Sequence, residues 1–337
     1  MKKTAVIPLK SFIFFILFII QLLFLAGCSD TGKSAESDKN FRRGTNGLDF
    51  EIHGVLEKMY EGTNFQAIVQ LFNKGAYDIS EAYVVVTLEK DYMGFGSGSQ
   101  SLQEVPVKLN GKSVLNPSGD FQFLKYNIQT KNVDKTSQYH NSVVTITACY
   151  KYMTYVITEV CIDPHLYDLA PTIKACEVKD LSLGDQGAPV AIEKIEVKML
   201  PSGENYVKPQ FIIHIKNKGN GNVINFKEEN GGIKNICTQE ELQYSNWNLL
   251  QLTKIAFSNE KFIYNVNNKG KNTMECVPDP KDKLLRLRDG EATIRCTAVE
   301  GIDKQESAYV TQLFIQLDYG YTVSKSEQIR IERQLLY

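Results

Sequence analysis

Seven cysteines are the residues of this 337-residue chain with the most definite chemistry. Cys28 ends an apolar N-terminal run, and the other six lie at Cys149, Cys161, Cys176, Cys237, Cys276 and Cys296. Their spacings include no Cys-x-x-Cys, so neither a zinc ribbon nor a thioredoxin-like redox pair is indicated. Six is an even number, as expected of a disulfide framework in an exported protein.

The pairing of these cysteines is predicted from the pattern of strands. A hairpin turning between Tyr152 and Tyr155 would place Cys149 beside Cys161, and the corresponding region of the second half of the chain has no cysteine. Cys296 is expected to face inward on its strand, and Cys276 lies one short strand upstream across two prolines, which favours a second pair. Cys176–Cys237 then follows by elimination. Six cysteines allow 15 pairings, so this connectivity is the least determined of the predictions.

Catalytic and metal-binding patterns are absent from the sequence. It has four histidines and no His-Glu-x-x-His, Gly-x-Ser-x-Gly or Walker loop. The glycine-rich stretch 94–98 precedes no helical pattern, as a phosphate-binding loop would require. Neighbouring carboxylates point to opposite faces of a strand, which makes poor acid–base pairs of Glu228 with Glu229, Glu240 with Glu241, and Asp279 with Asp282. We therefore expect no catalytic residue, no cofactor and no metal, with calcium at Asp163, Asp180 and Asp185 as a weaker alternative.

Aromatic residues give the one hint of a binding surface. Tyr150, Tyr152 and Tyr155 would cluster at the tip of the predicted hairpin. Tyrosine offers a large contact area at low entropic cost, as in loop-based binding surfaces. The alternative is a tyrosine-rich strand packed against its neighbour.

Composition and charge exclude several classes of protein. The chain is 43% hydrophobic and 23% charged, as in globular proteins. Its 38 basic residues are balanced by 39 acidic ones, so no positive field is available to hold a nucleic acid.

The N-terminal segment has the features of a secretory signal. Lysines precede an apolar run from Phe12 to Gly27, which is shorter than the roughly 20 residues of a spanning helix. The last residues, Leu25-Ala26-Gly27-Cys28, resemble the lipobox of prokaryotic lipoproteins, which implies cleavage after residue 27 and lipidation of Cys28. An uncleaved signal anchor is the alternative. The polar residues of 28–45 are expected to form a flexible tether, so the protein is predicted to be extracytoplasmic and membrane-anchored.

Beyond the tether, apolar residues alternate with polar ones in short runs separated by turn residues, which predicts strands. In the first half these are expected at Leu48–Ile52, Phe65–Phe72, Ala82–Glu89, Val105–Leu109, Phe121–Gln129, Val143–Lys151 and Tyr155–Cys161. Such a succession of short strands is typical of an all-β sandwich.

The second half repeats the design of the first. Residues 68–75 and 212–219 each form a strand pattern closed by Asn-Lys-Gly, at an offset of 144 residues. Residues 144–150 match 313–319, at an offset of 169, and a Tyr-x-Tyr falls at the end of both. The difference predicts an insertion near 226–250, where Thr238 and Glu241 form a capping-box pattern for a short helix.

These repeated motifs resemble the immunoglobulin-like domains of prokaryotic surfaces, especially the CARDB type associated with cell adhesion. The resemblance implies two tandem β-sandwiches, at 46–165 and 190–337, joined by a connector at 166–189. It brings no catalytic residues with it.

We therefore expect a non-catalytic, lipid-anchored protein that presents two immunoglobulin-like domains to another surface protein or a glycan. Two alternatives remain, a solute-binding lipoprotein of a transporter and a surface hydrolase. The first would need many helices and the second a recognisable nucleophile, base or metal set.

Overall fold

The fold consists of β-sheets, with one short helix in the described part of the chain. The computed structural model describes residues 41–96, 100–167, 174–227, 232–238, 244–267, 272–278 and 284–334. The predicted signal, lipobox and most of the tether lie outside these ranges. Residues 41–337 form one compact unit. None of the helices in the described ranges is long and apolar enough to cross a membrane.

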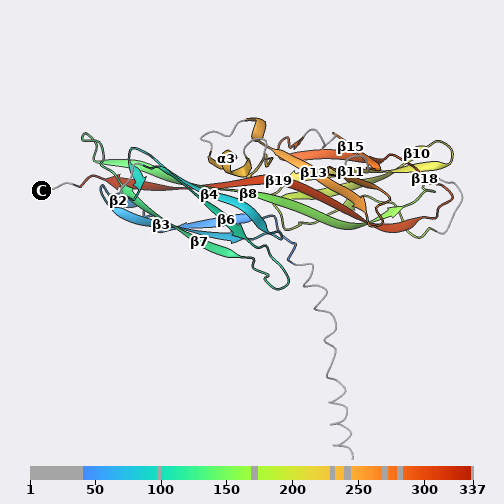
Figure 1. Cartoon of the computed structure of the whole chain (residues 1–337), viewed down its shortest axis with the longest axis horizontal. Coiled ribbons are helices and arrows are strands. Elements are labelled where there is room, and N and C mark those ends of the chain that lie inside the picture. The colour runs from blue at the N-terminus through green and yellow to red at the C-terminus, as the bar shows by residue number, and fades with distance from the viewer. Residues whose placement is uncertain are drawn as a thin grey trace, which may run out of the picture. The chain divides into compact units, whose positions relative to one another are not determined.

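Three sheets, here named A, B and C, make up this unit (Figure 1). Sheet A has the order β1 (Leu48–His53), β3 (Asn64–Asn73), β7 (Phe121–Thr130) and β5 (Met93–Phe95). Sheet C has the order β15 (Met274–Val277), β17 (Glu291–Ala298), β11 (Tyr206–Asn217), β10 (Val190–Ser202) and β9 (Leu181–Ser182), with β18 (Ile302–Asp303) beside β11.

Sheet B is the largest and runs between the other two. Its order is β14 (Ile263–Asn265), β13 (Leu249–Phe257), β19 (Tyr309–Glu332), β8 (Tyr139–Ile162), β4 (Ile79–Leu88) and β6 (Leu102–Leu109). Three short strands join it: β12 (Asn222–Ile224) and β2 (Lys58–Tyr60) on β19, and β16 (Leu285–Arg286) on β13. All these pairs are antiparallel except the parallel pair of β2 with β19.

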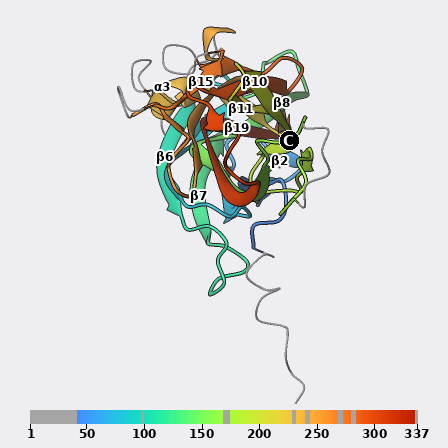
Figure 2. The same ribbon diagram turned by 90° about the vertical axis from the view of Figure 1, so that its right-hand side faces the viewer.

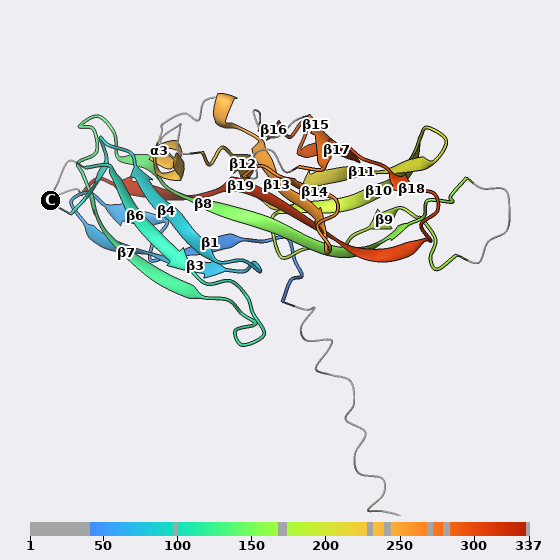
Figure 3. The same ribbon diagram turned by 45° about the vertical axis from the view of Figure 1, so that its right-hand side comes forward.

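Two strands of 24 residues, β8 and β19, form the axis of the fold (Figure 3). They pair along their whole length, from Ile162 with Tyr309 to Tyr139 with Glu332. The first part of β8 also pairs with β4, whereas the first part of β19 pairs with β13. Each end of sheet B therefore contains a segment of both long strands.

This continuity corrects the predicted hairpin between Tyr152 and Tyr155. The two strands expected at 143–151 and 155–161 are parts of β8, which contains no turn there. The sequence from Tyr150 to Cys161 contains no glycine, proline or asparagine, and its alternation simply continues. Residues 151–162 and 321–332 thus pair with the other half of the chain, so the ranges 46–165 and 190–337 are interleaved through β8 and β19.

One face of sheet B carries the core along its whole length. The even-numbered residues of β8 from Ser142 to Ile162 are buried, except for the half-buried Thr158. The odd-numbered residues of β19 from Thr311 to Tyr321 are all buried. Their apolar side chains share one continuous core with those of sheets A and C. Sheet A lies toward one end of β8 and β19 and sheet C toward the other, as Figures 1 and 3 show.

The predicted repeat is visible in the turns that end β3 and β11. Asn73 accepts a hydrogen bond from Gly75 N and donates one to the carbonyl of Tyr77, at 3.2 and 2.9 Å. Asn217 makes the same two bonds, with Gly219 N and the carbonyl of Gly221, at 3.3 and 2.9 Å. The repeated Asn-Lys-Gly therefore builds one turn twice, by the same side-chain contacts.

The insertion predicted near 226–250 contains the helix, but in a different place. Helix α3 spans Gly232–Thr238, and a short 3-10 turn, η2, spans Tyr244–Asn246. Thr238 ends α3 instead of capping its start, because its hydroxyl donates back to the carbonyls of Lys234 and Asn235. Viewed along the long strands, α3 lies at the periphery (Figure 2).

The disulfides are Cys149–Cys237, Cys161–Cys176 and Cys276–Cys296. The last was expected, and its cysteines lie directly opposite each other on β15 and β17. The predicted Cys149–Cys161 and Cys176–Cys237 pairs are wrong. Twelve residues of one extended strand separate Cys149 from Cys161 by about 40 Å, far beyond the Cα separation of about 4.4–6.8 Å that a disulfide can span.

Candidate functional site

The tyrosines predicted as a binding surface lie mostly in the core. Tyr150 is fully buried and Tyr152 is 4% exposed. Tyr155 is half-buried on the opposite, outer face of sheet B, where it stacks on Phe314 with ring centroids 6.3 Å apart. The prediction is wrong for Tyr150 and Tyr152, because an unbroken strand keeps even-numbered residues on the core face.

Tyr150 and Tyr152 instead form a cluster with Tyr319 and Tyr321 of β19. Neighbouring rings are 5.5 to 6.4 Å apart and close a four-membered circuit, referred to below as the tyrosine cluster. Tyr150 is opposite Tyr321 and Tyr152 opposite Tyr319 in the register, on either side of one central pair of residues. The Tyr-x-Tyr of each half thus meets that of the other half at the middle of the long strands.

Hydroxyl groups of this cluster hold the repeated turns. Tyr152 accepts a hydrogen bond from Tyr77 N at 3.1 Å, and Tyr321 accepts one from Gly221 N at 2.9 Å. Burial raises the pKa of Tyr321 to about 12 and that of Tyr152 further above the ordinary value of 10. These tyrosines stabilise the fold in their neutral form.

The outer face of sheet B carries the insertion, beginning with α3. Ile233, Ile236 and Cys237 lie on one face of the helix and are buried against Val85 and Cys149 of the sheet. The Cys149–Cys237 disulfide joins the helix covalently to β8.

A glycine makes room for this contact. A Cβ at Gly320 would lie 2.7 Å from Cδ1 of Ile233 and 2.9 Å from the carbonyl oxygen of Ile224. Its partner in the register is Lys151, which forms an ion pair with Glu81 at 2.6 Å. The central residue is therefore a lysine in β8 and a glycine in β19. Only the glycine leaves room for Ile233 of α3 and for Ile224.

A groove of about 690 Å³ lies beside α3, and we call it the α3 groove. Its floor is the outer face of β4, β8 and β19, and its walls are α3, Trp247 and residues 220–224. Seven hydroxyl side chains line it, among them Thr145, Thr147, Thr322 and Ser324. The 17 lining residues include no lysine, arginine, histidine, aspartate or glutamate.

The hydroxyls of the floor are arranged as a ladder across β8 and β19. Thr147 and Ser324 are opposite each other with their oxygens 2.9 Å apart, and Thr145 and Ser326 repeat this at 3.0 Å. This ladder is not among the features predicted from the sequence. The available signal was the alternation of Thr145, Thr147 and Cys149, which places hydroxyls on the face opposite the apolar residues.

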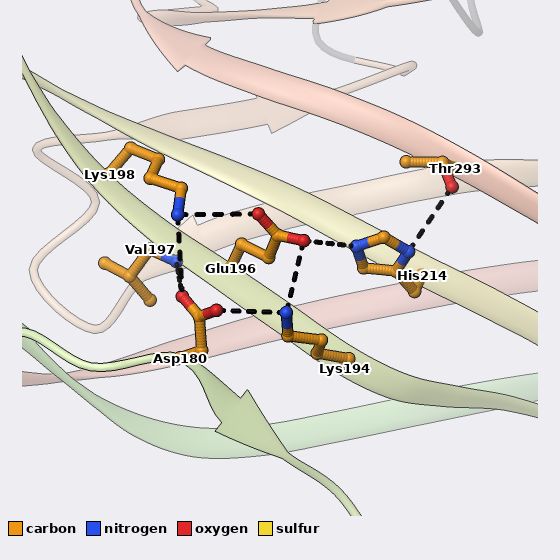
Figure 4. A network of polar contacts seen from close by, with 7 residues as sticks. All are labelled: Asp180, Lys194, Glu196, Val197, Lys198, His214 and Thr293. Carbon is orange, nitrogen blue, oxygen red and sulfur yellow. Dashed lines mark hydrogen bonds and ion pairs between the residues drawn. The ribbon is translucent and has the colours of Figure 1, made fainter.

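A second polar assembly lies on sheet C and is made of charged residues (Figure 4). Lys194 binds Asp180 and Glu196 at 3.0 and 3.2 Å, and Glu196 also contacts His214 at 3.1 Å. The hydrogen bond from Lys194 is the main cause of the lowered pKa values of Asp180 and Glu196. His214 is partly exposed on its strand, and the assembly is a network of ion pairs at the surface.

The weaker calcium alternative is not favoured by the contacts of its residues. Asp163 binds Lys174 at 2.7 Å, Asp180 binds Lys194, and Asp185 contacts Lys218 at 3.4 Å. Within the described ranges, no three histidine, cysteine, aspartate or glutamate side chains are grouped so as to hold a metal ion. The neighbouring carboxylates considered as acid–base pairs lie outside the described residues.

Comparison with known proteins gives no assignment. No family model matches the chain, and no curated protein matches it.

Proposed function

We propose that this protein is exported, anchored by a lipid on Cys28, and non-catalytic, and that it binds a surface protein or a glycan outside the cytoplasm. We further propose that its halves are two immunoglobulin-like sandwiches that share β8 and β19. The CARDB-like motifs of the sequence support this proposal, and so do the two equivalent Asn-Lys-Gly turns.

The observation that carries the proposed location is the set of three disulfides, which uses all six cysteines after Cys28. Cytoplasmic thiols are kept reduced, whereas exported proteins retain such bonds. The lipobox-like Leu25–Cys28 supplies the anchor in this proposal.

The test is metabolic labelling of cells that express the full chain, using an alkyne-tagged fatty acid. We expect label on the wild-type protein and on a Ser29→Ala control, and none on Cys28→Ala. Intact mass measurement should show loss of residues 1–27. An unlabelled chain that retains residues 1–27 would contradict lipidation and indicate an uncleaved signal anchor.

A further inference from the structure

We propose that the α3 groove binds a neutral saccharide. The inference rests on the proposed function, because it selects a glycan from the two kinds of partner considered there.

The first argument is charge. None of the 17 described side chains that line the groove is ionisable, since Cys149 and Cys237 are joined as a disulfide. Lys234, the lysine in the described helix α3, forms an ion pair with Glu104 at 2.6 Å. A phosphate, sulfate or carboxylate ligand would be desolvated here without a cation, which costs several kcal/mol per unpaired charge.

The second argument is the match of hydrogen-bonding groups. Seven hydroxyls and the amides of Asn220 and Asn222 line the groove. Each such group can donate and accept hydrogen bonds, as the hydroxyls of a sugar do. Among the described residues, the Thr147 hydroxyl contacts that of Ser324, which itself donates to the carbonyl of Ile146 at 3.4 Å. Each oxygen still has a lone pair that can accept a hydrogen bond from a ligand.

The third argument is the aromatic wall. Trp247 is half-buried and lines the groove. An indole ring offers a flat apolar surface with a polar edge, which suits the C–H face of a pyranose ring. The groove volume, about 690 Å³, falls within the range of about 300–1,000 Å³ typical of small-ligand sites.

The fourth argument is rigidity. The Cys149–Cys237 bond fixes the α3 wall, and Arg286 donates to the carbonyl of Trp247 at 2.7 Å. Asn248 N donates to the carbonyl of Val223 at 2.7 Å, which holds the tryptophan segment to β12. A site held in this way loses little conformational entropy on binding.

The test uses the intrinsic fluorescence of the oxidised full chain in detergent. Trp247 is its only tryptophan, so emission reports on the groove itself. The probes are neutral gluco-, manno-, xylo- and chito-oligosaccharides, with a sulfated polysaccharide and an uncharged peptide as comparisons. We expect a saturable change with at least one neutral saccharide and none with the sulfated one.

Matched variants connect that signal to the floor of the groove. Thr147→Val removes one hydroxyl at nearly constant shape and should raise the Kd about 2- to 10-fold, and Ser324→Ala should do the same. Thr293→Val, the same change on the exposed face of sheet C, should leave the Kd unchanged.

The inference is overturned if no neutral saccharide gives a saturable change, if only the sulfated chain or the peptide does so, or if Thr293→Val weakens binding as much as Thr147→Val. The fatty-acid labelling of Cys28 is independent of this result. A labelled chain that binds no saccharide refutes only the saccharide site, and an unlabelled chain that binds one refutes only the anchor.

Discussion

The hydroxyls of the tyrosine cluster provide a quantitative test of how the two halves are joined. Tyr321→Phe keeps the ring in the core but removes the acceptor of Gly221 N and the donor to Asn217 Oδ1. Tyr152→Phe makes the equivalent change in the other half, where Tyr77 N loses its acceptor and the carbonyl of Gly187 keeps only the hydrogen bond from Ala76 N.

The expected cost follows from the groups left without a partner. A buried donor or acceptor that loses its hydrogen bond costs about 1–3 kcal/mol, so each variant should lower the free energy of unfolding by that amount. The chain offers a matched control in Tyr126, which is 2% exposed and whose hydroxyl has no hydrogen-bond partner in the structure. Tyr126→Phe removes an unsatisfied polar group and should change the free energy by less than about 0.5 kcal/mol or stabilise the protein.

The assay is equilibrium unfolding in urea, followed by far-ultraviolet circular dichroism, for the wild type and the three variants. We expect similar losses for Tyr152→Phe and Tyr321→Phe, at unchanged dependence on urea. The reasoning is refuted if Tyr126→Phe costs as much as the other two, since the loss would then come from packing and not from the hydrogen bonds. It is also refuted if neither cluster variant is destabilised.

Three further predictions concern the same unit. The Cys149–Cys237 disulfide closes an 88-residue loop and should contribute about 4.6 kcal/mol in the chain-entropy model, so replacing both cysteines with serine should lower the free energy of unfolding by up to that amount in urea melts. Gly320→Val should displace α3, because its Cβ would meet Ile233 at 2.7 Å, and proteolysis should then cut near the helix at protease concentrations that spare the wild type. The raised pKa of Tyr321, about 12, means that its neutral form is favoured in the folded state, so its contribution should be complete below pH 10 and be lost as the pH rises from 10 to 12. Absorbance at 295 nm should show the exposed tyrosines ionising first and the cluster ionising together with unfolding.

Local pattern in the sequence was sufficient for five of the seven strands expected in the first half and for the repeated turns. Alternating side chains reveal which face of a strand is buried, and Asn73 and Asn217 act through bonds to residues two and four positions away. The even number of cysteines after Cys28 indicated disulfides, because that signal lies in the composition and needs no knowledge of the fold.

The sequence did not show which strands pair with each other or which cysteines are bonded, because both depend on contacts between distant parts of the chain. The alternation of residues 143–161 suits one long strand as well as two short ones, and only its register with β19 shows that Tyr150 and Tyr152 are internal. Because β8 is continuous, Cys149 and Cys161 lie about 40 Å apart, and two of the three predicted disulfides are wrong.

The α3 groove was the feature furthest from what the sequence alone determines. Its floor and walls come from β4, β8, β19 and the insertion, segments more than 200 residues apart in the chain. The sequence by itself determined the β-rich fold class and the two repeated turns, and it predicts export, because signal patterns, strand alternation and tight turns are local. Tertiary structure alone decided that the halves share their longest strands and that hydroxyls gather on one face, because both depend on which distant strands pair and in which register.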